Sequence, residues 1–307
     1  MVAQLARSYS CATPKPGKLD SFLPGRRLLD ALGVGHMTAI HDLEYMLRQG
    51  QMFTVTSSEA RAQQLIQEDR FASFLSSPRS DLLLVNGNFD YASAARISPL
   101  SFLCANLALS LSQNAHCLVL HYFCSLHDRP SDPLAGPQGL IRSILSQLLC
   151  TGWPFEQDFI NTRSYRDDIL SHSVEALCFT FRELVEQLPV DKRIHCIIDN
   201  ITTLESERWD ADLYTVIEML YHISVDDSCR QIFKVLITAP PARTLIERKL
   251  PTHNRLMLQQ AVSGGHQISD RLIYDDIHAG RSRGGYLDKT RQYADSEDEW
   301  SDDGYGG

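Results

Sequence analysis

Several features that would assign the chain to a broad class of proteins are absent from its 307 residues. No apolar run approaches the roughly 20 residues that a membrane-spanning helix needs, and the N-terminus has no secretory hydrophobic region. The formal net charge is -9 rather than positive, which argues against a nucleic-acid partner. None of the eight cysteines forms a C-x-x-C pair, and this pattern suits a reducing compartment. We therefore expect a cytoplasmic protein with no membrane and no nucleic-acid contact.

The composition is that of an ordinary globular protein, with 43% hydrophobic and 22% charged residues. We divide the chain into a flexible leader (1–25), a helical N-terminal segment (26–80), an α/β domain (81–279) and a disordered acidic tail (280–307). In the leader, Arg7, Lys15 and Lys18 precede the first acid, Asp20. A mitochondrial presequence is therefore the alternative to a cytosolic start.

From residue 81 onward, short apolar runs alternate with helical patterns of ten or more residues. This alternation predicts an α/β fold with three layers and a mostly parallel five-stranded sheet. The expected strands are 82–85, 117–123, 193–199, 232–238 and 255–258. The expected helices are 26–32, 38–48, 58–76, 99–112, 139–150, 173–188, 210–223, 242–249 and 268–277, with a short one near 155–160.

The apolar run 193–199 organises the chain because it ends on an acid, Asp199. The run is typical of a strand that is buried on both faces of a parallel sheet. Open α/β sheets bind their ligands at the carboxyl ends of the strands, where Asp199 is expected to lie. Alternatively, this single acid only caps the turn that follows the strand.

Short segments around these strands resemble a known family. They are Ser98-Pro-Leu-Ser-Phe-Leu-Cys-Ala at a helix start, His121-Tyr-Phe-Cys at a strand end, and Ile197-Ile-Asp-Asn after the central run. Over residues 70–260, with a helical segment in front, the chain is similar to the P-loop NTPase core of NACHT and related STAND signalling ATPases, especially a divergent fungal group. The resemblance implies a P-loop NTPase type of sheet, with the fourth strand between the first and the third.

The resemblance also implies roles for individual residues. Gly87 matches the first glycine of the phosphate loop, Asp199 the acid that directs Mg²⁺, and Thr238 the polar sensor at the end of the fourth strand. An intact loop reads G-x-x-x-x-G-K-[ST], but here the last three positions are Ala92, Ser93 and Ala94. No lysine occurs between Lys18 and Lys192. The chain therefore lacks the ammonium group that neutralises the β- and γ-phosphates.

A nucleotide could still bind at the start of the helix after Ser98, because free N–H groups and the helix dipole favour an anion there. Gly87, Asn88, Arg96 and Ser98 are the candidate binding residues, and ATP with Mg²⁺ at Asp199 is the cofactor that the resemblance implies. In the opposing interpretation, no cofactor binds and the aromatic residues Phe89 and Tyr91 fill the vacated phosphate site.

Two other clusters have simpler explanations. His121, Cys124 and His127 are the nearest match to zinc-ligand spacing, but neighbouring strand positions point to opposite faces and no second pair lies nearby. In the tail, six acids lie between Asp295 and Asp303, and Tyr293, Trp300 and Tyr305 are interspersed with the acids as in short recognition segments. Ser296 and Ser301 lie among these acids and are candidates for phosphorylation.

The sequence thus favours a non-catalytic, NTPase-like domain that serves as an interaction or scaffold module for protein partners. The alternative is a nucleotide-binding signalling switch or weak ATPase with an aberrant phosphate loop, in which Asp199 and Thr238 are the catalytic candidates. A third hypothesis is a truncated relative of a longer, repeat-containing protein.

Overall fold

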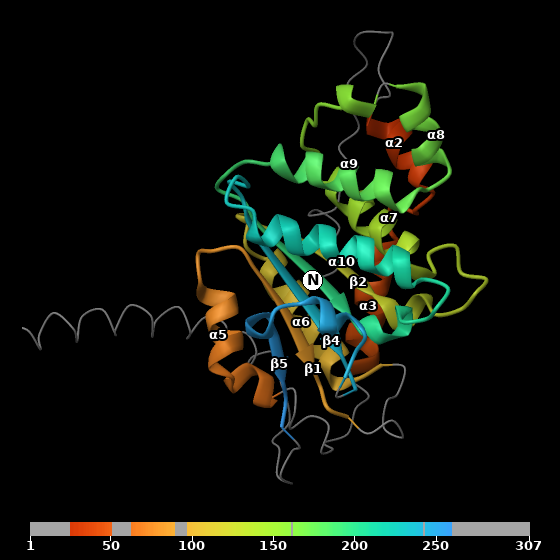
Figure 1. Cartoon of the computed structure of the whole chain (residues 1–307). Coiled ribbons are helices and arrows are strands. Elements are labelled where there is room, and N and C mark those ends of the chain that lie inside the picture. Colours follow the sequence, from red (N-terminus) through yellow and green to blue (C-terminus); the bar gives the residue numbers. More distant parts are fainter. Residues whose placement is uncertain (1–24, 51–62, 90–96, 161, 242, 260–307) are drawn as a thin grey trace, which may run out of the picture.

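The structure is a computed structural model that describes residues 25–50, 63–89, 97–160, 162–241 and 243–259. Figure 1 shows a central sheet with helices packed around it. Within the described ranges, no helix is both long and apolar enough to cross a lipid bilayer.

The sheet has five strands, all parallel, in the order β2-β3-β4-β1-β5. This order places the fourth strand between the first and the third, as expected. The bounds predicted for the second and third strands are those of the structure, because both strands are mainly apolar and buried. The strands are β1 (Asp81–Asn86), β2 (Cys117–Phe123), β3 (Arg193–Asp199), β4 (Ile232–Ala239) and β5 (Arg255–Met257).

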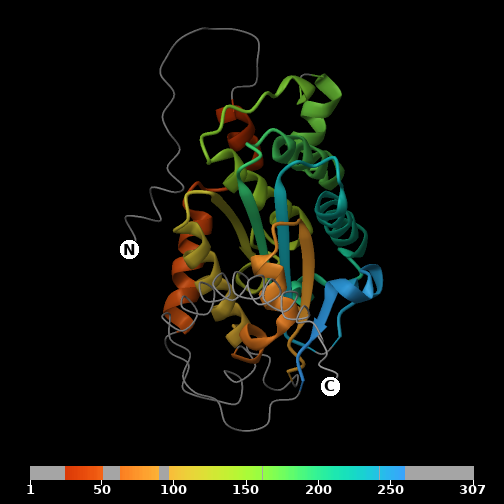
Figure 2. The ribbon, with the colours of Figure 1, turned by 90° about the vertical axis from the view of Figure 1, so that its left-hand side faces the viewer.

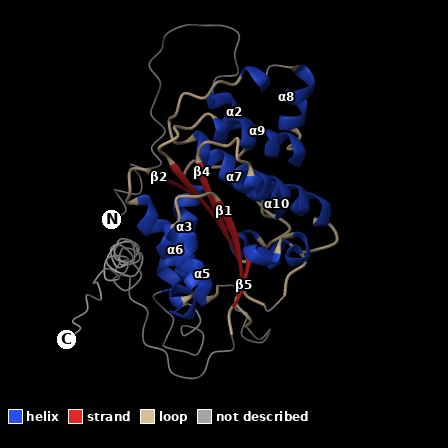
Figure 3. Ribbon diagram, turned by 60° about the vertical axis from the view of Figure 1, so that its left-hand side comes forward, coloured by secondary structure: helices blue, strands red, loops and turns tan. Residues whose placement is uncertain are grey.

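Helices cover both faces of the sheet and complete the predicted three layers (Figure 3). One face carries α3 (Thr38–Gly50), α5 (Asp69–Ser76) and α6 (Pro99–Ser112), and the other carries α7 (Gly136–Leu149), α9 (Val174–Glu186) and α10 (Asp210–Val225). Strand β1 shows why: Leu82 and Leu84 enter one hydrophobic core, whereas Leu83 and Val85 enter the other. Alternate residues of a strand point to opposite faces, so an unbroken apolar run needs cover on both.

The N-terminal helices pack against the α/β layers. Helix α2 (Gly25–Leu32) lies against α7 and α8 (Arg163–Leu170) at one end of the sheet (Figures 1 and 2). The buried Arg142 donates through Nε to the Leu32 carbonyl at 2.6 Å, and the His172 ring lies 2.9 Å from the Ala31 carbonyl. Both contacts satisfy carbonyls in the last turn of α2, which have no partner inside the helix.

Several predicted helix bounds are wrong. Helix α7 begins at Gly136 rather than at residue 139, because the proline at 137 is tolerated in a first helical turn. The helix expected over 58–76 is interrupted at Glu68, whose backbone is extended (ψ 124°). The segments near 155–160 and 242–249 contain only the 3₁₀ turns η3 (Asp158–Ile160) and η5 (Ile246–Lys249).

Helix α8 was not predicted. Its sequence is strongly polar, and Ile169 is the residue of this helix that is buried, so it offers almost no apolar periodicity. The helix expected over 268–277 lies outside the described residues, as do the acidic tail and residues 1–24 of the leader.

Candidate functional site

Three of the residues singled out from the sequence meet at the carboxyl edge of the sheet. In the parallel register, Val85 lies beside Thr238 and Ile198 beside Ile237, so β1, β4 and β3 end at the same level. The Thr238 hydroxyl donates to Asp199 Oδ1 at 2.7 Å and accepts the Asn200 backbone N–H at 3.0 Å. Asp199 and Thr238 are therefore joined by a hydrogen bond. Thr238 lies beside Val85, two residues before Gly87.

Asp199 is completely buried. Burial raises the pKa of its carboxyl from 3.8 to about 6, although hydrogen bonding by Thr238 and Ser101 and by the Asn200 backbone opposes this shift. Its second oxygen, Oδ2, has no hydrogen-bond partner within 3.5 Å in the described part of the chain. The Asp199 carboxylate therefore contacts protein groups and not solvent.

The start of α6 is satisfied by its own hydroxyl groups. Ser98 is the N-cap: its side chain accepts the Ser101 backbone N–H at 3.2 Å, and the Ser101 hydroxyl accepts the Ser98 N–H at 3.1 Å. This reciprocal pair is a capping box, so the predicted helix start is confirmed. Ser98 is 3% exposed, and its hydroxyl is bonded within the helix.

The turn after β1 continues the sheet-like hydrogen bonding. The Gly87 N–H donates to the Ala239 carbonyl at 2.7 Å, and the Phe89 N–H donates to the Pro240 carbonyl at 2.9 Å. Asn88, between them, has a left-handed backbone (φ 53°), and its side-chain amide donates to the Leu258 carbonyl at 3.3 Å. Two backbone N–H groups of the expected phosphate loop thus donate to carbonyls at the end of β4 and directly after it.

The Phe89 ring fills the space over Gly87. Its side chain is 7% exposed, and a Cβ atom added to Gly87 would lie 2.6 Å from a carbon of this ring and 2.9 Å from Leu100. The glycine is required here because the phenyl ring approaches its backbone so closely. Of the other predicted binding residues, Arg96 lies outside the described residues, as does Tyr91.

These contacts are a test of the cofactor that the resemblance implies. A phosphate loop aims several backbone N–H groups at the anion and adds a lysine. Here the N–H groups of Gly87 and Phe89 donate to carbonyl oxygens of the protein. The Phe89 ring lies over Gly87, and Asp199 is completely buried. The described residues of this turn and Asp199 do not fit a Mg²⁺-nucleotide at this position.

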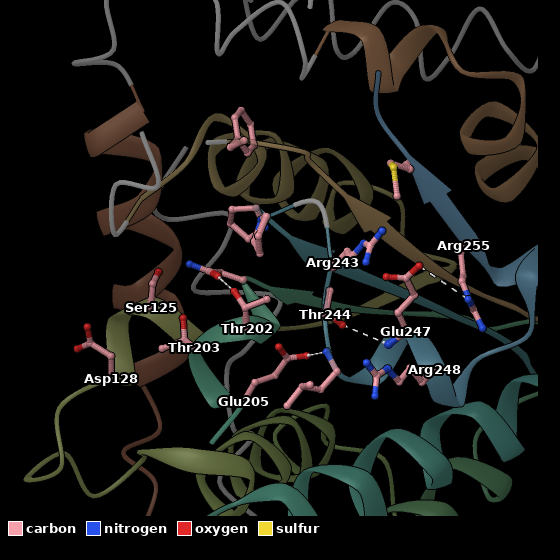
Figure 4. Close-up of a pocket in the computed structure, with 16 residues that line it drawn as sticks. Ser125, Asp128, Thr202, Thr203, Glu205, Arg243, Thr244, Glu247, Arg248 and Arg255 are labelled. Atoms are coloured by element: carbon pink, nitrogen blue, oxygen red, sulfur yellow. Dashed lines mark hydrogen bonds and ion pairs between the residues drawn. The ribbon is translucent and has the colours of Figure 1, made fainter. Parts of the chain in front are cut away.

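Beside this turn, a cleft of about 930 Å³ opens along the same edge of the sheet (Figure 4). Residues that follow β1, β2, β3 and β4 line it, together with Arg255 and Met257 of β5. We call it the arginine cleft, because three arginines line it. They are Arg243, Arg248 and Arg255.

The walls of the arginine cleft are held together by two glutamates. Glu205 Oε1 accepts the backbone N–H groups of Leu245 at 2.6 Å and Ile246 at 3.2 Å, which joins the turn η4 (Ile201–Leu204) to η5. Glu247 accepts a hydrogen bond from the Asn86 amide at 3.3 Å and lies 3.8 Å from Arg255. Both acids therefore already have partners.

Arg243 and Arg248 differ from Arg255. Both are exposed, and within the described ranges neither guanidinium group has a hydrogen-bond or ion-pair partner. Figure 4 shows them on the same side of the cleft as Thr244. Asp128, on the opposite rim, has an interaction of its own. The cleft is thus lined by groups of both signs, the three arginines and the carboxylates of Asp128, Glu205 and Glu247.

The sequence did not predict this cleft. Its lining comes from turns that are far apart in the chain, and no motif connects them. The only available indication was their common position after strands of a parallel sheet.

A buried histidine completes this edge next to the end of β2. His127 lies between two carboxylates, with Nε2 at 3.1 Å from Asp42 of α3 and Nδ1 at 3.0 Å from Asp132, and its ring stacks on Tyr122. Burial lowers the pKa of His127, but the hydrogen bonds and charges of Asp42 and Asp132 outweigh that effect and raise it. The His127 ring links α3 to the loop after β2.

The three residues with zinc-like spacing serve separate purposes. His121 lies 2.9 Å from the Ala39 carbonyl, His127 bonds the two aspartates, and Cys124 is a buried thiol. Among the residues that the structure describes, no group of three or more His, Cys, Asp or Glu side chains is arranged to hold a metal ion.

In comparisons with known proteins, no family model matches the chain, and neither a curated protein nor a solved structure matches it. The fold and the geometry of the site are therefore the basis for any functional conclusion.

Proposed function

We propose that this chain is a non-catalytic, NTPase-like domain that serves as an interaction or scaffold module for protein partners. The observation that carries the proposal is the turn after β1, where Phe89 covers Gly87 and two loop N–H groups bond Ala239 and Pro240. A P-loop NTPase type of sheet is consistent with the strand order β2-β3-β4-β1-β5, and NACHT and STAND ATPases are the relatives that we infer.

The buried Asp199 supports the same proposal. A Mg²⁺-directing acid must reach the metal, whereas this carboxylate is 0% exposed and is bonded to Thr238. Efficient hydrolysis also needs a cationic group on the transferred phosphate, and no lysine lies between residues 18 and 192. We therefore assign Asp199 and Thr238 a structural role at the edge of the sheet.

A partly exposed aromatic cluster formed by η3, α8 and α9 supports a protein-binding role. The rings of Phe159, Tyr165 and Phe179 form a cluster with centroids 5.9 to 6.5 Å apart, and Phe179 is 48% exposed. Nearby on α8, Leu170 is 63% exposed. Exposed aromatic clusters of this kind are enriched at protein–protein contacts.

We further propose a cytoplasmic location. All seven cysteines in the described part of the chain are free thiols, and free, buried thiols are typical of proteins that work in a reducing compartment.

Thermal unfolding with and without ATP and Mg²⁺ tests the proposed loss of nucleotide binding. A ligand at 100 times its dissociation constant stabilises the folded state by about 2.7 kcal/mol, so binding would raise the melting temperature by several degrees. We expect no shift. A Mg²⁺-dependent rise that is lost in Asp199→Asn, a variant of nearly the same shape, would contradict the proposal.

A nucleotide-binding switch is the second candidate, and the arginine cleft is the observation that favours it. The cleft lies where open α/β sheets bind ligands, and Arg243 and Arg248 are available to bind phosphate oxygens. For this candidate, ATP should stabilise the chain without Mg²⁺, and Arg243→Gln should reduce the effect.

A further inference from the structure

A second cavity lies at the amino edge of the sheet, opposite the edge that carries the arginine cleft. Its volume is about 420 Å³, and small-molecule sites in proteins span roughly 300 to 1,000 Å³. The first residues of β2 line it, together with the last residue of α6 and the segments that follow α6, α7 and α9. All of these residues belong to the described ranges. We call this cavity the amino-edge pocket.

The walls of the amino-edge pocket are tied together by hydrogen bonds of the protein itself. The Lys192 ammonium group donates to the Ala115 carbonyl at 2.6 Å, and the Arg193 N–H donates to the His116 carbonyl at 2.9 Å. These two bonds join the segment before β3 to the segment before β2. The Thr151 hydroxyl donates to a carbonyl in the last turn of α7 at 2.8 Å. A pocket that is formed in advance loses less free energy to ordering when a ligand binds.

Most of the lining is apolar. Trp153 is 41% exposed, Leu118 and Pro189 are half-buried, and Leu188 is buried. The exposed part of β2 ends with Leu118, because the strand is buried from Val119 onward. A flat, apolar ligand would cover these surfaces, and an aromatic ring would also stack on the indole.

The electrostatics of the pocket favour an uncharged ligand. Of the described residues that line it, Lys192 is the one with a formal charge. Helices α6, α7 and α9 all end at this edge, and the C-terminal end of a helix carries a partial negative charge. Asp191, the neighbour of Lys192 in the chain, adds an exposed carboxylate that lies 3.6 Å from His116. These negative groups offset the positive charge of Lys192.

Lys192 can still select a ligand by hydrogen bonding. An ammonium group has three donors, and one of them is used on Ala115. We propose that the amino-edge pocket binds a small, uncharged aromatic molecule, with its ring against Trp153 and Leu118 and with a carbonyl or hydroxyl oxygen that accepts a hydrogen bond from Lys192. This site lies away from the carboxyl edge, so it goes beyond the proposed function and does not depend on whether a nucleotide binds there.

Fluorine NMR of the full chain labelled with 5-fluorotryptophan tests the proposal, with indole-3-carboxamide as the probe. This probe is uncharged and aromatic, and its amide oxygen can accept a hydrogen bond from Lys192. The chain has three tryptophans, and Trp153→Phe assigns the resonance of Trp153. We expect this resonance to shift and to saturate with a dissociation constant on the order of 1 mM or below. The Trp209 resonance should stay in place, because this side chain packs against the core.

Lys192→Met keeps an unbranched side chain and removes its donors, so it should weaken binding of the probe about tenfold. Lys249→Met is the matched control, because it makes the same change on η5, at the carboxyl edge. This control should leave the dissociation constant unchanged. Indole-3-carboxylate and 3-(aminomethyl)indole have nearly the same shape as the probe but carry a charge. Each should bind about threefold more weakly, because its charge loses hydration in the pocket without an opposite charge in return.

Three results would overturn the proposal. The first is the absence of a saturable Trp153 shift up to about ten times the expected dissociation constant. The second is an unchanged dissociation constant in Lys192→Met while the Trp209 resonance shows an intact fold. The third is binding of the carboxylate or the amine as tight as that of the amide, which would mean that the pocket does not favour an uncharged ligand.

Discussion

The carboxyl edge of the sheet contains two regions, which differ in whether their polar groups are buried with partners or exposed without them. In the first, which we call the filled edge, Phe89 covers Gly87, Asp199 bonds Thr238, and His127 lies between two aspartates. In the second, the arginine cleft, Arg243 and Arg248 face an open space of about 930 Å³. The groups of the filled edge are packed and hydrogen-bonded, whereas Arg243 and Arg248 are exposed and have no partner among the described residues.

The turn after β1 is filled by side chains of the protein itself. The Phe89 ring packs over Gly87 and belongs to the same hydrophobic core as Leu100. The arginines cannot be explained in that way, because exposed and unpaired charges contribute little to stability. Substitutions in the two regions should therefore have very different costs.

The largest expected loss of stability comes from Phe89→Ala. Removing a buried phenyl ring leaves a cavity over Gly87 and beside Leu100, and such truncations cost about 3 kcal/mol or more. Denaturant unfolding measures this loss. Met257→Ala is the matched control on the cleft side, where a side chain that is 49% exposed should cost less than about 0.5 kcal/mol. Equal losses in the two variants would remove the distinction between the regions.

Asp199→Asn should show a pH-dependent gain. The folded-state pKa of about 6 is raised above the usual 3.8, so the folded state binds the proton more tightly than the unfolded state does. The contribution of Asp199 to the stability of the wild type is thus greatest below pH 4. It decreases as the pH rises to about 6. Because two units of pKa correspond to about 2 to 3 kcal/mol, Asn should become more favourable by that amount between pH 4 and pH 7.

The measurement is the difference in unfolding free energy between Asp199→Asn and the wild type at both pH values. Thr238 can still donate to the Asn carbonyl oxygen, so the substitution removes the charge and keeps the hydrogen bond. A free-energy difference that does not change with pH would mean that the Asp199 carboxylate is solvated. Asp199 would then resemble the exposed groups of the arginine cleft and not those of the filled edge.

The sequence predicted the fold wherever local chemistry decides the structure. The apolar runs 117–123 and 193–199 fixed β2 and β3, and the pair Ser98-Pro99 fixed the start of α6. One of the two interpretations of the turn after β1 placed an aromatic ring there, and the Phe89 ring lies over Gly87. Each of these inferences depends on neighbours in the chain.

The rest could not be predicted because it depends on contacts between distant segments. Helix α8 has little apolar character and gains its stability from packing against α9 and α2. The arginine cleft exists because Glu205 binds backbone N–H groups some 40 residues further along the chain. His127 obtains one of its two partners, Asp42, from α3, 85 residues earlier in the chain. No spacing rule detects such pairs.

His127→Gln tests the third contact of the filled edge. The pKa of His127 is raised by Asp42 and Asp132, so its stabilising contribution is complete below its ordinary pKa of about 6.5 and is lost as the pH rises through the higher folded-state value. We expect a cost of about 1 to 2 kcal/mol at pH 5.5 and a smaller cost at pH 8.5. Unfolding free energies at both values measure it.

His116→Gln is the control for this prediction. The His116 side chain is 71% exposed and lies 3.6 Å from Asp191, where water screens the interaction. Its substitution should have little effect at either pH. If His127→Gln costs as much at pH 8.5 as at pH 5.5, the ring acts through packing on Tyr122 rather than through its charge.

The smallest effect on stability should come from Arg243→Gln and Arg248→Gln, each within about 0.5 kcal/mol of the wild type. Arg142→Gln provides the contrast for the same chemical change, because Arg142 is 5% exposed and donates to the carbonyls of Leu32 and Pro133. Breaking those contacts leaves buried carbonyls unpaired and should cost about 2 to 4 kcal/mol in denaturant unfolding. A loss above about 1 kcal/mol at Arg243 or Arg248 would mean that these side chains hold the fold together. Arg243 and Arg248 would then be engaged in contacts within the fold, and their charges would not be available to a binding partner.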